Sequence, residues 1–298
     1  MSRATRASRK FPRHGVKHKM DLSVVIPARD EEGSIEQTLA AIAGTLHTER
    51  IPFEIVVVDD GSTDRTAACV RQSAVGYPGI RLVNNTGRHG FGMAVRAGLA
   101  QATGEAIAVM MADGSDSPED LVRYYRKIEE GYDCAFGSRF IRGSKILDYP
   151  VHKLAINRMA NWFIRILFGL RYNDITNAFK CYRRQAIEGM QPLLSPHFNL
   201  TVEMPLKAIV RGYSYAVVPI SWTNRKSGMS KLKIKEMGSR YLFIVLLVWL
   251  EHHLSRGDYL RPQEAEERAA TRHDVADANG DSSEARARIA ASGPPISR

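Results

Sequence analysis

The feature that most constrains the fold is the segment 54–66, EIVVVDDGSTDRT, in which a run of β-branched residues ends in two adjacent acids. The run carries no polar residue on either face, which is typical of a parallel strand buried on both sides of a sheet. Asp59 and Asp60 follow, and Gly61 then permits a tight reversal of the chain. The segment therefore predicts a central strand whose end presents two carboxylates.

A helix is expected after this turn, because Ser62 and Thr63 are both favourable N-cap residues and Arg65 would then open the helix. The same order of strand and helix recurs over residues 20–140. Further strand patterns are expected at 22–26, 80–84, 106–111 and 133–136. This alternation predicts an α/β fold with a single doubly wound, mostly parallel sheet.

Acids follow two of the predicted strands. Asp113, with Asp116 three residues on, comes after the strand at 106–111 in the same way that Asp59 and Asp60 follow theirs. Open α/β sheets bind ligands at the carboxyl ends of their strands, so we interpret these acids as one site. One pair can hold the hydroxyls or base of a nucleotide, and the other a hard divalent cation. The alternative is a helix cap beside solvated turn acids.

Basic residues gather on later loops: Arg139, Arg158, Arg225, Lys226 and Lys231. An anionic acceptor or a diphosphate requires such a cluster. Each of these cations taken alone is better explained as a solvated surface charge, and only their shared position on loops after strands or at a helix start makes the two explanations equal.

The tails differ from the rest of the chain. The net charge of +10 is concentrated in residues 1–19, which hold seven Lys and Arg and no acid. We expect this tail to be disordered, with a transit peptide or contact with anionic lipid or nucleic acid as alternatives. No apolar stretch follows it, so no signal peptide is expected. Residues 255–298 lack periodicity and predict a second disordered tail.

Two helical patterns, at 151–170 and 234–253, carry apolar faces flanked by Lys and Arg. Such helices resemble those that lie in the plane of a membrane surface. The longest apolar run, residues 241–250, has half of the ~20 residues that a spanning helix needs. The alternative is that both helices pack on the domain or on a second subunit.

Several motifs taken together resemble a known family. Their order and spacing are similar to a family-2 glycosyltransferase of the GT-A fold, on the segments VVIPARDEEGSIEQTL, VVVDDGSTDRT, GRHGFGMAVRAGL, MADGSDSPED and GSR. Later segments resemble the polyprenyl-phosphate (dolichol-phosphate) hexosyltransferase branch: DITNAFKCYRR, FNLTVEMPLKAIVRGYSY and NRKSGMSK. The resemblance covers about residues 22–253.

The resemblance implies roles for matching residues. Nucleotide contacts fall on Pro27, Ala28, Arg29, Glu31, Asp59 and Asp60. Asp113 would hold Mg²⁺ or Mn²⁺ at the diphosphate. Arg139 and Arg158 would hold an acceptor phosphate, and Glu203 would line the sugar pocket. The diphosphate or acceptor would also meet Arg225, Ser230 and Lys231 of one loop, with Lys231 counted among the catalytic residues.

One departure from the family bears on the metal. Relatives commonly carry Asp-x-Asp followed by Leu-Gln, whereas here the first Asp is Met111 and the last position is Ser115. Asp113 alone keeps the family ligand. We hypothesise that Asp116 or Ser115 completes the shell, or that the diphosphate and waters do.

The resemblance implies an inverting transfer of a hexose from a GDP-mannose or UDP-glucose type donor to a polyprenyl phosphate. A phosphate monoester is already a dianion at neutral pH and needs no general base. A soluble or carbohydrate hydroxyl acceptor remains the alternative, and Glu203 or Asp174 would then be the base. A nucleic-acid-binding protein driven by the basic tail, or an inactive scaffold, is a further alternative.

These inferences predict a domain organisation and a location. We expect a GT-A domain over 20–232, including the interface helix at 151–170, and a C-terminal amphipathic helix over 233–254. The protein is expected at the cytoplasmic face of a membrane as a peripheral enzyme. A membrane subunit or a homo-oligomer is a possible partner, and no nucleic acid is expected.

Overall fold

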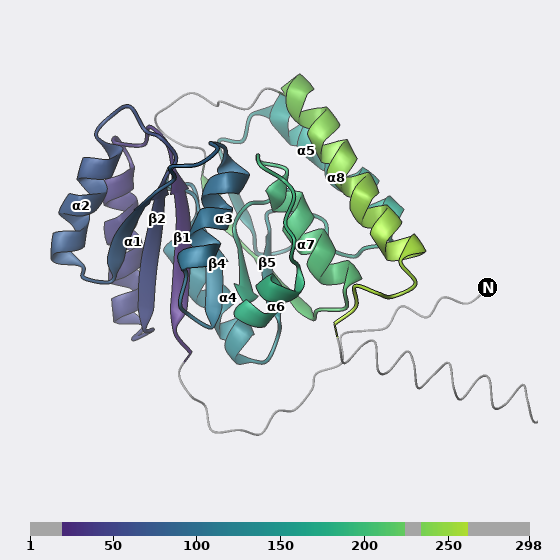
Figure 1. Ribbon diagram of the computed structural model, residues 1–298, viewed down its shortest axis with the longest axis horizontal. Coiled ribbons are helices and arrows are strands. Elements are labelled where there is room, and N and C mark those ends of the chain that lie inside the picture. Colours follow the sequence, from purple (N-terminus) through teal and green to yellow (C-terminus); the bar gives the residue numbers. More distant parts are fainter. Residues whose placement is uncertain (1–19, 224–233, 262–298) are drawn as a thin grey trace, which may run out of the picture.

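A computed structural model describes residues 20–223 and 234–261, with the side chains of 234–237 left out. Seven strands form one sheet in the order β3-β2-β1-β4-β7-β5-β8. Their bounds are β1 (Leu22–Ala28), β2 (Phe53–Asp59), β3 (Ile80–Asn84), β4 (Ala106–Val109), β5 (Cys134–Ser138), β7 (Lys180–Arg183) and β8 (Tyr215–Pro219). The sheet forms the centre of the molecule (Figure 1).

Helices cover both faces of this sheet. One apolar core packs beneath α1 (Ile35–Thr48), α2 (Thr66–Gly76) and α4 (Pro118–Glu129). The second core packs beneath α3 (Phe91–Gln101), α5 (Val151–Phe168), α6 (Arg184–Gly189), α7 (Leu200–Val210) and α8 (Ile234–Leu254). Figure 1 shows α5 and α8 side by side at the outer edge of this second layer. The prediction of a doubly wound α/β sheet is confirmed.

The sheet departs from a purely parallel one at a single strand of the part described. β7 runs antiparallel to both β4 and β5, while the other pairs in the sheet are parallel. The sequence predicted a mostly parallel sheet and did not identify this reversed strand. The reversal matters for the site, because it brings the residues that precede β7 to the edge where β4 and β5 end.

A second, two-stranded sheet was not predicted. β6 (Lys145–Leu147) pairs in parallel with β9 (Ser221–Thr223). An isolated bridge also joins Trp222 to Asp116, and the Thr223 amide donates to the Ser115 carbonyl at 3.3 Å. This small sheet therefore connects the chain after β8 to the loop after β4.

Two predicted details of the turns are wrong. α2 begins at Thr66 with Arg65 at the N-cap position and no side-chain cap, so neither Ser62 nor Thr63 caps it. Both hydroxyl residues bind Asp30 of the neighbouring turn instead. The strand predicted at 106–111 ends at Val109, since the Met111 amide turns away to donate to the Asp116 carboxylate at 3.1 Å.

The apolar helices were expected not to cross a membrane. Within the part of the chain that the structure describes, no helix has the length and hydropathy to span one. The predicted division into tails, domain and C-terminal helix stays a prediction, and the two predicted disordered tails lie largely outside the described residues.

Candidate active site

The turns after β1 and β2 are tied together at the carboxyl edge of the sheet. The Thr63 amide donates to the Asp30 carboxylate at 2.8 Å, and the Asp30 amide donates to the Ser62 hydroxyl at 3.0 Å. The Glu31 amide donates to the Thr66 hydroxyl at 2.8 Å. Each turn thus satisfies the polar groups of the other, which fixes the backbone near the predicted nucleotide residues.

The predicted nucleotide residues meet at this edge but differ in access. Pro27 and Ala28 end β1 with buried side chains, whereas Arg29 is exposed with its guanidinium 4.0 Å from Asp30. Asp59 is half-buried and accepts the Ser62 amide at 3.2 Å. The fold therefore brings these predicted residues together, with Arg29 and Asp59 the more accessible.

Asp60 lies beneath this edge and supports a neighbouring loop. Its side chain is 4 % exposed. The carboxylate accepts the Asn85 amide group at 2.6 Å and the Gly90 backbone amide at 2.8 Å, and the His89 ring lies 3.3 Å away. These contacts hold the loop before α3, so the geometry favours a supporting role for Asp60 and leaves its predicted nucleotide contact a prediction.

The glycine-rich loop at 87–92 is built for close packing. Gly90 adopts φ 143° at the start of α3, and a Cβ on Gly92 would overlap the Ser195 carbonyl oxygen. The Met93 amide donates to the Pro196 carbonyl at 3.3 Å. The glycines therefore let the start of α3 approach the chain before α7, which is the structural alternative to a phosphate loop.

Asp113 and Asp116 lie on the loop after β4. Asp113 is half-buried and accepts the Ser115 amide at 3.1 Å. Burial raises the pKa of Asp116 to about 7, the Met111 amide opposes that shift, and the charge of Asp113 adds to it. Both carboxylates therefore come from one loop that follows the end of β4.

These residues fit a divalent cation that shares its ligands with a substrate. In the described part of the chain no group of three or more His, Cys, Asp or Glu side chains could hold a metal alone. Mg²⁺ commonly takes one or two carboxylates and completes its shell with substrate phosphates and water. A half-buried Asp113 with Asp116 beside it matches that chemistry, and Met111 adds no oxygen ligand.

Arg139 is held rigidly by a buried partner. Its backbone amide and Nε both donate to Oδ2 of Asp174 at 2.9 and 2.8 Å, and Nη2 donates to Oδ1 at 2.7 Å. Burial would lower the pKa of Arg139, but the Asp174 carboxylate outweighs it and raises that pKa further above its ordinary value. The fork geometry fixes a permanent positive charge where β5 ends.

Arg158 is brought to the same place from α5. Its guanidinium carbon lies 4.5 Å from the Phe140 ring centre, and the guanidinium carbon of Arg139 lies 5.5 Å from the same ring. Arg158 is exposed, and its Nη1 lies 3.5 Å from the Asn173 carbonyl oxygen. The two arginines predicted to hold an acceptor phosphate therefore share one aromatic side chain between them.

Glu203, predicted to line the sugar pocket, lies in the packed interior of the domain. It is fully buried in α7, and its oxygens accept the backbone amides of Leu194 and Ser195, each at 2.7 Å. Lys207 pairs with the same carboxylate at 2.8 Å. These contacts favour a role in fixing the chain before α7, and the predicted catalytic role stays a prediction.

Lys180 was not identified from the sequence. It is buried in β7 and donates to the backbone carbonyls of Ile175, Asn177 and Thr201. Burial lowers the pKa of Lys180 to about 7 against the opposing charge of Asp174. It anchors the loop that carries Asp174. No spacing signal marks it, because its partners are backbone oxygens brought together only by the fold.

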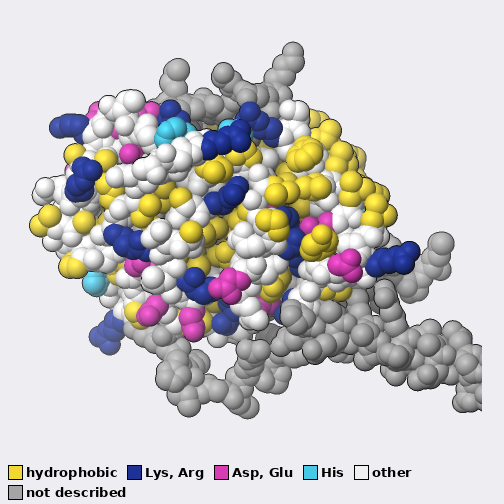
Figure 2. Space-filling view, viewed as in Figure 1, with side chains coloured by type: hydrophobic (Ala, Val, Ile, Leu, Met, Phe, Trp, Pro, Cys, Tyr) yellow, Lys and Arg dark blue, Asp and Glu magenta, His cyan; other side chains and the backbone are white. Residues whose placement is uncertain are grey.

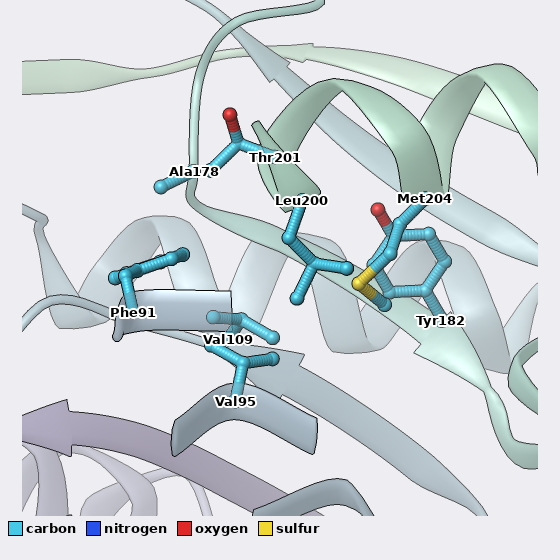
Figure 3. A pocket seen from close by; sticks show the side chains of 8 residues that line it. All are labelled: Phe91, Val95, Val109, Ala178, Tyr182, Leu200, Thr201 and Met204. Carbon is cyan, nitrogen blue, oxygen red and sulfur yellow. The ribbon is translucent and has the colours of Figure 1, made fainter. Parts of the chain in front are cut away.

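The remaining predicted loop residues, Arg225, Lys226, Ser230 and Lys231, lie outside the described residues. One apolar pocket lies nearby. Figure 3 shows side chains from α3, β4, β7 and α7 that converge on it, among them Val95, Val109, Tyr182 and Met204. Its cavity volume of about 10 Å³ is about what one water molecule requires, so it is a packing gap and not a substrate site.

Solved structures match this architecture. Glucosyl-3-phosphoglycerate synthase from Mycobacterium tuberculosis, crystallised with Mn²⁺, uridine diphosphate and phosphoglyceric acid, has a TM-score of 0.58 at 19% identity over 78% of each chain. The sheet and the acid-lined edge, together with this match, define a GT-A fold.

Sequence comparisons give the family. The glycosyl transferase family 2 model matches residues 23–190, so the chain belongs to that family and is a glycosyltransferase. Polyprenol monophosphomannose synthase from Mycolicibacterium smegmatis is 32% identical over 70% of this chain and 80% of the relative. Dolichol-phosphate mannosyltransferase from Pyrococcus furiosus is 32% identical over 80% of this chain, which spans 66% of that relative. The resemblance stated from the motifs is confirmed.

Proposed function

We propose that this chain transfers a mannosyl group from a nucleoside-diphosphate mannose to a polyprenyl phosphate, with inversion at the anomeric carbon. Support comes from the two relatives, whose names describe mannose transfer to polyprenol and dolichol phosphates. In this reaction an acceptor phosphate oxygen bonds to the anomeric carbon. The bond from that carbon to the donor diphosphate breaks, and the electron pair leaves with the diphosphate.

The observation that carries the proposal is that both carboxylates predicted as possible bases, Asp174 and Glu203, are buried and bound by other groups. Asp174 is fully buried and bound on both oxygens by Arg139, and Glu203 is fully buried and bound by two amides and Lys207. If a hydroxyl acceptor used either of these predicted bases, that carboxylate would first have to leave its buried partners to take the proton. A phosphate acceptor loses its second proton near pH ~6 and attacks as a dianion without a base.

The donor side of the proposal rests on the acids at the sheet edge. Asp59 and the turn after β1 would bind the nucleoside, and Asp113 with Asp116 would hold Mg²⁺ or Mn²⁺. Glucosyl-3-phosphoglycerate synthase has been crystallised with uridine diphosphate and either of these cations. When bound, the cation supplies positive charge to the departing diphosphate. Arg139 and Arg158 would position the acceptor phosphate on the other side of the anomeric carbon.

The outer helices suit a lipid-linked acceptor. Exposed apolar side chains lie along α5 and α8, including Met159, Trp162, Phe163, Phe243 and Leu246. Figure 2 shows hydrophobic side chains gathered over this part of the surface. We propose that this α5/α8 surface lies on the cytoplasmic face of a membrane and brings the site to its acceptor.

The membrane step is tested with vesicles. Trp162→Asp with Leu246→Asp should reduce cosedimentation with anionic phospholipid vesicles at least ~tenfold, since each buried large side chain contributes about 1.5–3 kcal/mol. Val75→Asp is the matched control, because Val75 is an exposed apolar residue on α2, in the layer on the opposite face of the sheet. Equal loss in both variants would contradict the proposed surface.

The reaction is tested with radiolabelled GDP-mannose and UDP-glucose as donors and polyprenyl phosphate as acceptor, with Mg²⁺, Mn²⁺ or chelator. We expect label in the lipid phase from GDP-mannose, dependent on the cation. Label from UDP-glucose alone would support hexose transfer to polyprenyl phosphate but would show that the hexose is glucose and not mannose. Label from neither, with nucleotide binding intact, would contradict the proposed acceptor.

A further inference from the structure

The space between the two predicted substrate anchors is bordered by an aromatic pair that neither the motifs nor the proposed reaction uses. Tyr149 and Trp222 pack with their ring centres 4.8 Å apart at an interplanar angle of 47°. Both residues are only partly buried. They come from different segments, since Tyr149 precedes α5 and Trp222 lies in the middle of β9.

One ring of the pair lies against the acceptor side of the site. The guanidinium carbon of Arg139 lies 5.6 Å from the Tyr149 ring centre. Because Asp174 fixes this guanidinium in position, the ring is fixed beside the charge that would hold the acceptor phosphate. An acceptor bound to Arg139 therefore has Tyr149 as an immediate neighbour.

The other ring is tied to the donor side. The backbone of Trp222 forms the bridge to Asp116, and the next residue, Thr223, donates to the Ser115 carbonyl. Trp222 is also registered opposite Ile146 in the small sheet. The aromatic pair thus lies between the loop that carries Asp113 and Arg139, which follows β5, so it borders both predicted substrate anchors.

We propose that Tyr149 and Trp222 form the wall of the acceptor site against which the first isoprene unit, next to the phosphate, packs. The inference rests on the proposed function and identifies where its acceptor binds. An isoprenyl phosphate places an apolar carbon chain directly after a dianion. A fixed guanidinium with an aromatic ring beside it matches both parts of such a ligand.

The wall makes a prediction that differs from that of the α5/α8 surface. A contact with the first isoprene unit contributes equally to short and long acceptors. Trp222→Ala should therefore raise KM about tenfold for a one-isoprene phosphate, for farnesyl phosphate and for a long polyprenyl phosphate alike. Trp162→Asp on α5 should raise KM only for the long acceptor. Trp222→Phe should show a much smaller rise in KM than Trp222→Ala, because it keeps an aromatic ring.

The donor serves as the internal control for this experiment. Trp222→Ala should leave the dissociation constant of the Mg²⁺–nucleoside diphosphate within about twofold, because the ring contacts the acceptor and the loop bridge is made by backbone atoms. A donor KM that rises while the acceptor KM stays constant would overturn the proposal and assign the pair to the hexose. An unchanged KM for both donor and acceptor would also overturn the proposal and leave Trp222 with only a packing role.

Binding can also be followed without turnover. The chain has three tryptophans, so Trp162→Phe with Trp249→Phe leaves Trp222 as the single emitter. Farnesyl phosphate should change its emission in a saturable titration without donor, and inorganic phosphate or farnesol should have much weaker effects. An emission that does not respond to farnesyl phosphate would overturn the proposal.

The outcomes separate this inference from the proposed function. Transfer to polyprenyl phosphate with an unchanged acceptor KM in Trp222→Ala and Tyr149→Leu would contradict the wall and leave the reaction standing. A titration that succeeds while no donor yields product would support the wall and contradict the proposed reaction.

Discussion

The two ends of the sheet differ in how far their charged side chains are buried. Around the turns after β1 and β2, polar partners lie in neighbouring, partly exposed turns, as in the pair Asp30 and Thr63. Around β5, β7 and α7 the charges are buried and paired, as in Arg139 with Asp174 and Glu203 with Lys207. The first arrangement leaves Asp59 and Asp113 partly exposed for a ligand, whereas the second buries its carboxylates against their partners.

This difference teaches that an acid near a site acts on substrate only if the fold leaves its oxygens accessible. A variant of an accessible acid on the proposed donor side should therefore lose activity and keep its stability. A variant of a buried pair on the acceptor side should lose stability first.

The largest effect is expected for the buried pair beside β5. Asp174→Ala leaves the Arg139 guanidinium buried without its partner, which should lower the free energy of unfolding by about 3–5 kcal/mol in a urea titration. Glu130→Ala is the control, because its pair with Lys127 is exposed and contributes below ~1 kcal/mol. Similar losses in the two variants would break the comparison between buried and exposed pairs.

The next effect is expected on activity alone. Asp113→Ala should lower kcat/KM about 10²–10³-fold by removing the anchor of the cation at the diphosphate, with an unfolding curve close to that of the parent. Asp21→Ala is the control, since Asp21 is exposed before the start of β1. Cation-dependent turnover that survives in Asp113→Ala would remove Asp113 from the site.

Glu203 tests the boundary between the two regions. Glu203→Gln replaces a carboxylate that accepts two amides, so the free energy of unfolding should fall by about 1–3 kcal/mol while kcat at saturating substrate changes only a few-fold. A variant with unaltered stability and no turnover would instead support the catalytic role that the motif predicted.

The smallest effect concerns pH. Glu54 lies in β2 near its start, and although burial opposes the shift, hydrogen bonds from Ser23, Thr103 and Arg81 lower its pKa from 4.5 to about 2. The unfolded chain therefore binds more protons between pH 2 and 4.5, so stability rises with pH across this window. The contribution is fully present above about pH 4.5 and lost toward pH 2.

Solvent exposure reduces this contribution to about 1–2 kcal/mol, below the ~3 kcal/mol that the full shift represents. Glu54→Gln should remove that part of the pH dependence in acid unfolding followed by circular dichroism. An unchanged acid midpoint would contradict the assignment.

The sequence predicted the strand and turn around Asp59 well because local chemistry builds them. A buried β-branched run followed by Asp59 and Gly61 specifies strand, carboxylate and turn within a few residues. The predicted caps failed at Ser62 and Thr63, since both bind a turn more than thirty positions away.

The region around β5, β7 and α7, the proposed acceptor side, was harder to predict because most of its contacts join segments that are distant in the sequence. Nothing in the spacing of Asp174 or Glu203 shows that buried partners occupy their oxygens, so both were candidate bases. Lys180 was not predicted because its partners are backbone carbonyls, which any residue type supplies. The β6–β9 pair was not predicted because strands of three residues are too short to show a pattern in the sequence. Motif resemblance, however, placed Arg139 and Arg158 in one region, and the fold brings them to a shared ring.

The most direct test of the account compares polyprenyl phosphate with the polyprenol of the same chain length, using labelled GDP-mannose and saturating Mg²⁺. Because neither Asp174 nor Glu203 is accessible as a base, we predict label in the phosphate lipid and none above background in the alcohol. Transfer to the alcohol at a comparable rate would require a general base and would contradict the central claim.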